Sequence, residues 1–203
     1  LKVEEVRTAL ELDSNDGQLF ASVIKALNSL EQDGELILTR KNRYSLPERI
    51  GLVKGTIQMH KKGFAFLIPE DESRADVYIN PTDLKGAMNR DIVFVRIISD
   101  PVGDQRFEGV VEQIIERHST RIVGTYEDKG SFGFVIADDK RIPNDIFIKK
   151  SESLGAVTGH KVIVQITKFP EGTMSAEGEI IEILGHKNDP GMDILSIIHK
   201  YDI

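Results

Sequence analysis

Apolar side chains in the first part of the chain recur at helical spacing. Residues 2–12 place three of them on one face, three and four positions apart: Val3, Val6 and Leu10. The same pattern returns over residues 18–32. The stretch between them holds Asn15 and Asp16, and either residue suits the cap of a following helix. We therefore predict two helices joined by a turn.

A β-hairpin is predicted after the second helix. Gly34 stands where the end of a helix favours a left-handed residue. Beyond it, apolar residues at 36–38 and 44–46 flank a polar turn. The order helix, turn, helix, hairpin is that of a small α+β winged-helix-like domain, which we place at residues 1–50. The tip of this hairpin carries three basic residues: Arg40, Lys41 and Arg43.

Two roles are open for this first domain. The basic hairpin tip would allow a contact with nucleic acid, whereas the apolar helical stripes would allow a structural or docking role. The second helix offers only Lys25 as a basic group, which is little for a helix that reads DNA. The structural or docking role is therefore favoured.

From residue 51 onward the pattern changes to that of short strands. Runs of β-type residues alternate with turn-type residues at 55–59, 64–68, 77–80, 92–98 and 109–115. The same texture continues from Ile122. This spacing predicts an all-β barrel or sandwich.

The strand region is a tandem repeat. Several segments recur after 69 residues, among them Asp76-Val77-Tyr78-Ile79 as Asp145-Ile146-Phe147-Ile148. Phe64-Ala65-Phe66 aligns with Phe132-Gly133-Phe134 if one residue of slack is allowed. This period is too long for a solenoid and fits a five-stranded OB barrel. We therefore predict two all-β OB-fold barrels, at residues 51–118 and 119–187.

A final segment, residues 188–203, is predicted to be a linker helix. Asp189 suits an N-cap and Pro190 suits the first helical position. Apolar residues then line one face: Ile194, Leu195, Ile198 and Tyr201. We expect this helix to pack on the second barrel or to lead to a domain outside this chain.

The charge balance limits how the chain can bind nucleic acid. The net charge is −7 and no region is basic overall, so binding must use local basic clusters and aromatic side chains. No apolar run reaches the length of about eighteen residues that a membrane helix needs. The absence of cysteine excludes disulfides and thiolate metal sites and fits a cytoplasmic location. Because the chain begins with Leu1, we expect a piece of a longer protein.

Each repeat has a strand in which two aromatic residues alternate with a small one. Residues i and i+2 of a strand share a face, so the two rings stand side by side, and a second strand adds a third ring. Exposed rings of this kind stack unpaired bases, which contributes about 1–3 kcal/mol per base. The candidate stacking residues are Phe64, Phe66, Tyr78, Phe132, Phe134 and Phe147.

The rings could instead belong to the barrel cores, where alternating aromatic residues are usually found. Their cationic surroundings and their occurrence in both repeats favour the stacking role. The candidate phosphate-binding residues flank the rings: Lys61, Lys62, Lys129, Lys149 and Lys150.

These motifs resemble those of cold-shock domains. Lys62-Gly63-Phe64-Ala65-Phe66-Leu67 is similar to the first ribonucleoprotein motif of that family, and Val77-Tyr78-Ile79 to the second. The resemblance implies OB-type barrels that stack single-stranded bases. The chain departs from the family in two ways: Met59-His60 and Asp128-Lys129 replace an aromatic pair, and Ala65 replaces a glycine.

The order of the parts resembles the N-terminal region of the bacterial ribonuclease R family. Residues 141–148 and 182–191 carry the closest likeness. The resemblance implies that a magnesium-dependent catalytic domain with clustered aspartates follows Ile203 and degrades RNA from the 3′ end. It also implies that this domain is an intramolecular partner and that Mg²⁺ binds there.

No catalytic, metal-binding or cofactor-binding residue is predicted in the chain itself. Its adjacent carboxylates lie in turn-like stretches, its five histidines lack metal-ligand spacing, and no phosphate-binding glycine loop is present. We therefore expect a single-stranded RNA-binding accessory region of a 3′-to-5′ exoribonuclease. Two alternatives stay open: a winged-helix DNA-binding regulator with OB modules, and a structural or partner-docking module.

Overall fold

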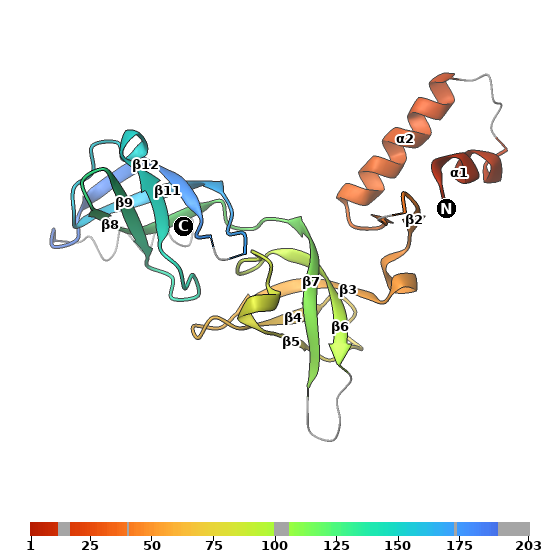
Figure 1. Cartoon of the computed structure of the whole chain (residues 1–203), viewed down its shortest axis with the longest axis horizontal. Coiled ribbons are helices and arrows are strands. Elements are labelled where there is room, and N and C mark those ends of the chain that lie inside the picture. Colours follow the sequence, from red (N-terminus) through yellow and green to blue (C-terminus); the bar gives the residue numbers. More distant parts are fainter. Residues whose placement is uncertain (12–16, 40, 100–105, 173, 191–203) are drawn as a thin grey trace.

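The protein forms three units that follow one another along the chain (Figure 1). The structure is a computed structural model, and it describes residues 1–11, 17–39, 41–99, 106–172 and 174–190. A helical unit with a small hairpin lies on the side of the first barrel that faces away from the second barrel. Three predicted features fall outside the described residues: the caps Asn15 and Asp16, the tip residue Arg40, and the helix beyond Pro190.

The N-terminal unit contains two helices and a hairpin, which confirms the predicted order. Its elements are α1 (Val3–Ala9), α2 (Gly17–Gln32), β1 (Ile37–Leu38) and β2 (Tyr44–Ser45). The helices bury little: α1 buries no residue and α2 buries only Leu27. The assignment of this unit to the winged-helix fold stays a prediction.

Each predicted barrel is a closed sheet of five strands. After the short 3-10 helix η1 (Pro47–Ile50), the first barrel contains β3 (Leu52–Met59), β4 (Ala65–Pro69), β5 (Val77–Ile79), β6 (Ile92–Ser99) and β7 (Phe107–Glu116). The second contains β8 (Arg121–Asp128), β9 (Phe132–Ala137), β10 (Ile146–Lys149), β11 (His160–Lys168) and β12 (Glu177–His186). The 3-10 turns η2 (Pro81–Asp83) and η3 (Lys150–Glu152) follow the third strand of each barrel.

Both barrels have the same topology. In the first, the strands pair in the order β3-β4-β5-β7-β6, and β6 pairs with β3 to close the barrel. In the second, β8, β9, β10, β12 and β11 take the equivalent positions. One pair in each barrel is parallel, β5 with β7 and β10 with β12, and the others are antiparallel. This shared topology confirms the prediction of two OB-type barrels.

Alternate residues of the strands fill the barrels. In β4 the side chains of Ala65 and Leu67 are fully buried, and in β9 that of Val135 is. Each barrel has its own core cluster of such residues. The alternation follows from the two-residue period of a strand, which sends successive side chains to opposite faces. The other face of β4 and β9 is therefore directed outward.

The two barrels share a seam. Met88, from the loop before β6, packs into the core cluster of the second barrel. Gly86 adopts φ +83°, and a Cβ atom at this position would collide with the carbonyl oxygen of Pro170. Arg117 lies between the barrels, where its Nη1 donates to the carbonyl of Gly86 at 2.7 Å and its guanidinium covers the ring of Phe169.

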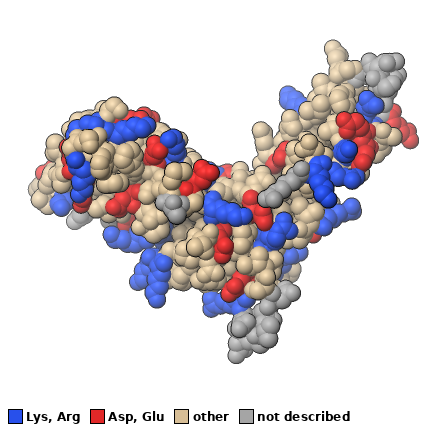
Figure 2. Space-filling model, viewed as in Figure 1, with Lys and Arg blue, Asp and Glu red and all other residues tan. Residues whose placement is uncertain are grey.

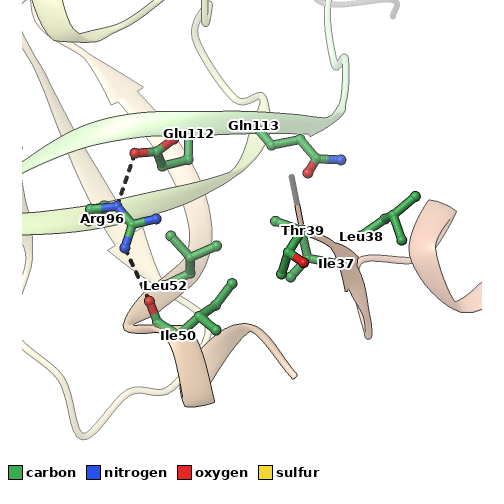
Figure 3. A pocket seen from close by; sticks show the side chains of 8 residues that line it. All are labelled: Ile37, Leu38, Thr39, Ile50, Leu52, Arg96, Glu112 and Gln113. Carbon is green, nitrogen blue, oxygen red and sulfur yellow. Dashed lines mark hydrogen bonds and ion pairs between the residues drawn. The ribbon is translucent and has the colours of Figure 1, made fainter. Parts of the chain in front are cut away.

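The N-terminal unit meets the first barrel across a cleft of about 480 Å³ (Figure 3). Ile37, Leu38 and Thr39 line one side, and Gln113 lies opposite. Arg96 braces the barrel side, because its guanidinium donates both to Glu112 at 3.0 Å and to the carbonyl of Ile50 at 3.2 Å. This contact fixes the segment that links the hairpin to β3.

Candidate nucleic-acid interface

The three candidate rings of the first barrel form one cluster, which we call platform 1 (Phe64, Phe66 and Tyr78). The ring of Phe64 lies 5.7 Å from that of Phe66 and 5.4 Å from that of Tyr78, between centroids. Strand register explains the third contact, since Phe66 is directly opposite Tyr78 in the β4–β5 pair. All three rings are partly exposed, and none belongs to the core cluster.

The second barrel repeats this cluster as platform 2 (Phe132, Phe134 and Phe147). Phe134 is opposite Phe147 in the β9–β10 pair. The centroid distances from Phe132 are 5.4 Å to Phe134 and 5.6 Å to Phe147. These rings are also partly exposed and lie outside the core cluster. The structure thus brings each predicted set of three together on an outer face, while the neighbouring positions fill the core.

His60 adds a fourth ring to platform 1. Its imidazole stacks on Phe64 with centroids 4.4 Å apart and planes 13° from parallel. The tight β3–β4 turn causes this contact, because the His60 amide donates to the Phe64 carbonyl at 2.8 Å. From the sequence, Met59-His60 was expected to lack the aromatic pair of cold-shock domains. In the first barrel a ring partly restores that position.

Arg106 is a second residue that the sequence analysis missed. Its guanidinium carbon lies 5.2 Å from the centroid of Phe66. Arg106 stands just before β7, and β7 pairs with β5 beside Tyr78. The contact joins residues forty positions apart in the chain. Sequence spacing gives no signal for such a contact, since it depends on the parallel strand pair.

The five candidate lysines differ in their surroundings. Lys61 and Lys62 are exposed at the β3–β4 turn, and no carboxylate among the described residues lies within ion-pair distance of either. Lysines of the second barrel contact carboxylates: Lys129 with Glu127 at 2.9 Å, Lys150 with Asp128 at 2.6 Å, and Lys149 with Glu152 at 3.4 Å and Glu177 at 3.7 Å. Their role in phosphate binding stays a prediction.

The ion pairs of the second barrel shift the pKa values of their members. The hydrogen bond from Lys150 lowers the pKa of Asp128, and the same bond raises the pKa of Lys150. The hydrogen bond from Lys168 lowers the pKa of Glu177 and raises that of Lys168. Each member of these pairs therefore holds its charged form more strongly than it would alone.

A difference in packing lies beneath the two platforms. Gly133 separates the two phenylalanines of β9, and a Cβ atom there would come closer than 3.0 Å to the ring of Tyr126. Tyr126 is fully buried, and burial raises the pKa of its hydroxyl. In the first barrel the equivalent residues are Ala65 and Ile57, both fully buried. The first barrel thus combines Ala65 with the smaller Ile57, and the second combines Gly133 with the larger Tyr126. The smaller neighbour leaves room for the methyl group of Ala65, which explains why alanine replaces glycine there.

The hairpin tip of the N-terminal unit is only partly available. Arg43 donates to both carboxylate oxygens of Glu5 at 3.1 Å. Lys41 is exposed, and Arg40 lies outside the described residues. Over the described part of the face in Figure 2, basic and acidic side chains are interspersed. The role of the tip in nucleic-acid binding stays a prediction.

A buried carboxylate was missed by the sequence analysis. Asp91 is fully buried and accepts hydrogen bonds from the amides of Met88 at 2.8 Å and His118 at 3.1 Å. It also accepts one from Nη1 of Arg117 at 2.9 Å. Because all its partners are structural donors at the seam, we assign Asp91 a role in holding the barrels together.

Two findings concern only the residues that the structure describes. No group of three or more His, Asp or Glu side chains in these ranges is placed to hold a metal ion. Among the same residues, no helix has the length and apolar character needed to cross a membrane.

Comparison with known proteins places both barrels in described domain families. Residues 55–114 match the model of the Ribonuclease B OB domain, and residues 134–203 match a cold shock domain model. Among solved structures, RNase R of Mycoplasma genitalium without RNA has a TM-score of 0.67 at 19% identity, covering 74% of this chain and 24% of that one. Yeast Ssd1, a pseudonuclease, has a TM-score of 0.63 at 18% identity over 76% of this chain and 26% of that one. At these identities the likeness concerns the fold.

Curated relatives extend the similarity over the whole chain. Ribonuclease R of Acidithiobacillus ferrooxidans is 31% identical over 100% of this chain and 46% of its own length. Ribonuclease R of Escherichia coli K12 is 31% identical over 96% of this chain and 24% of its own length. The chain thus spans less than half the length of these relatives. From the two domain matches and this similarity over the whole chain we conclude that the chain carries a Ribonuclease B OB domain and a cold shock domain and is homologous to part of ribonuclease R.

Proposed function

We propose that the chain binds single-stranded RNA through platforms 1 and 2. The observation that carries this proposal is the duplication of one exposed aromatic cluster at equivalent positions of two barrels. Every base has a planar π-face and can stack on such rings. The platforms should therefore bind unpaired strands without strong sequence preference. A related structure supports the proposal: RNase R of Mycoplasma genitalium has been solved in complex with ribose-methylated single-stranded RNA.

We further propose that one strand of RNA contacts both platforms. A cleft of about 270 Å³ lies at the seam, and it is lined by Lys62 and Gly63, next to platform 1, and by Ile146, next to platform 2. A strand that crosses this seam would contact both platforms. The second contact then becomes intramolecular, which raises the overall affinity without a new kind of interaction.

In the parent protein this region would deliver RNA to a catalytic domain. The relatives are named ribonuclease R and are more than twice as long as the chain, so we propose that the parent is a 3′-to-5′ exoribonuclease. Its Mg²⁺ would bind in that other domain, as the resemblance to ribonuclease R implies. The catalytic domain would be an intramolecular partner, and a cytoplasmic location remains our prediction.

The N-terminal unit fits a docking role better than a nucleic-acid contact. Helix α2 leaves Ile24 and Leu30 exposed, at 36% and 41% of their surface. Arg43 of the hairpin tip is engaged by Glu5. Replacing Lys41 with glutamine should therefore leave the affinity for duplex DNA and for RNA unchanged, as measured by equilibrium binding. A loss of duplex binding would support the DNA-regulator alternative.

The test of RNA binding removes two rings of platform 1. We expect F64A/F66A to weaken binding of a labelled single-stranded RNA of about twenty nucleotides by roughly thirtyfold, from about 1 kcal/mol for each ring at the least. The matched control is I98A, which removes an exposed apolar side chain from β6, a strand that carries none of the platform 1 rings. Circular dichroism checks that both variants are folded. Unchanged RNA affinity in a folded F64A/F66A variant, or equal competition by duplex RNA, would refute the proposal.

A further inference from the structure

The two platforms differ in the cations available beside them. At the β3–β4 turn of the first barrel, the segment His60-Lys61-Lys62-Gly63-Phe64 places two lysines at the tip. The equivalent turn of the second barrel, Lys129-Gly130-Ser131-Phe132, is one residue shorter and keeps one lysine. Both turns close in the same way, by an amide-to-carbonyl bond across the tip, from His60 to Phe64 and from Lys129 to Phe132.

In the second barrel, the lysines beside platform 2 form ion pairs with carboxylates. Glu127 lies opposite Phe134 in the β8–β9 pair and contacts Lys129. The first barrel has the neutral Gln58 at this position, opposite Phe66. Asp128 contacts Lys150, whereas the first barrel has Met59 there. The sequence of the first barrel therefore lacks the two acids that pair with lysines in the second.

The lysines beside platform 2 would gain little free energy by exchanging their carboxylate partners for an RNA phosphate. A phosphate that displaces Asp128 from Lys150 forms one ionic contact, breaks another and leaves a carboxylate beside the new anion. Exposed pairs of this kind are individually weak, but the repulsion remains after they open. The raised pKa of Lys150 and the lowered pKa of Asp128 agree with a pair that holds both charges. Lys61 and Lys62 have no such competitor among the described residues.

We infer that the two barrels divide the binding of RNA between them: the first captures the phosphate backbone through Lys61 and Lys62, and the second holds bases by stacking alone. This inference rests on the proposed function and adds to it. Attraction to the backbone depends on salt, because bound lysines release counterions, whereas stacking does not. The first barrel would thus set the salt dependence of binding, and the second would retain RNA when salt is high.

The experiment measures the affinity for a single-stranded RNA of about twenty nucleotides as a function of salt. Removing Lys61 and Lys62 as K61Q/K62Q should make the log–log salt slope shallower by about 1.4, from about 0.7 for each lost phosphate contact. Between 50 and 200 mM salt, the wild type would then lose about sevenfold more affinity than the variant.

Matched variants of the second barrel remove its ion pairs without changing its net charge. E127Q/K129Q and D128N/K150Q should keep the wild-type salt slope, because the pairs make no phosphate contact. E127Q alone should steepen the slope, since it frees Lys129 and recreates the Gln58 of the first barrel. A slope in either paired variant that falls as far as in K61Q/K62Q, or an unchanged slope in K61Q/K62Q, overturns the division of roles while RNA binding stands. Absence of RNA binding by the wild type overturns the proposed function itself.

Discussion

Replacing Gly133 with alanine tests the packing beneath platform 2. The new methyl group would lie closer than 3.0 Å to the ring of Tyr126, whereas carbon atoms in contact normally lie about 3.5–4.0 Å apart. The ring is fully buried within the core cluster of the second barrel. Overpacking of this kind costs about 1–3 kcal/mol, and the loss of glycine flexibility in the unfolded chain offsets about 0.4–1 kcal/mol. We expect a net destabilisation of about 1–2 kcal/mol.

The first barrel supplies the compensating change. Y126I recreates the Ile57 and Ala65 pair when it is combined with G133A. By itself Y126I leaves a cavity, although it also removes a buried hydroxyl that has no hydrogen-bond partner among the described residues. In the double variant the methyl group enters the space of the lost ring. The two changes should therefore be less harmful together than their sum, by about 1–2 kcal/mol.

Hydrogen exchange followed by NMR is the appropriate assay, because it assigns stability to each barrel separately. The amides of β8 and β9 report on the altered barrel, and those of β3 and β4 provide an internal reference. The reasoning is refuted if G133A exchanges like the wild type in β8 and β9. It is also refuted if the effects of the two substitutions add within about 0.3–0.5 kcal/mol, the range expected of independent sites.

Two further predictions concern charged side chains. D91A should lower the free energy of unfolding in urea by about 3 kcal/mol, because it leaves the Arg117 guanidinium and two amides without their acceptor. The control E70A removes one member of an exposed ion pair and should change the free energy of unfolding by no more than about 1 kcal/mol. Equal effects of the two variants would contradict the role of Asp91. In a carboxyl ¹³C NMR titration, Asp128 should show a pKa below the ordinary aspartate value of 3.8, and K150A should return it toward that value. Because the pKa is lowered in the folded state, Asp128 stabilises the protein above pH 3.8, and this contribution is lost as the pH falls through the folded-state pKa. A pKa of Asp128 that is unchanged in K150A would disprove the pair.

The sequence allowed the barrels and the faces of their strands to be predicted, because both depend on local information. The two-residue period of a strand fixes that Phe132 and Phe134 share a face, and the 69-residue repeat shows that the arrangement occurs twice. The turn that stacks His60 on Phe64 is also local. The spacing of His60 and Phe64 alone does not show that their rings stack, because the stacking depends on how the turn closes.

Other parts of the site depend on neighbours that sequence spacing does not reveal. Arg106 contacts Phe66 because β7 pairs in parallel with β5. Lys150, which follows β10, forms an ion pair with Asp128 at the end of β8. The exchange of Ile57 with Ala65 for Tyr126 with Gly133 is visible when the repeats are aligned. Only the packed structure shows that the two members of each pair touch. The five candidate lysines were predicted from their charge and position, which do not reveal the carboxylates beside Lys129, Lys149 and Lys150.

The seam between the barrels bears on how a duplicated domain folds. Met88 is encoded in the first copy of the repeat but completes the core of the second, and Arg117 and Asp91 hold the junction from the first copy. A cut between residues 118 and 119 would therefore leave the side chain of Met88 exposed on the first half and open an apolar site on the second half. The repeated unit is thus not self-sufficient, because part of the core of the second copy is supplied by the first. Either barrel produced alone should be less stable than it is within the pair.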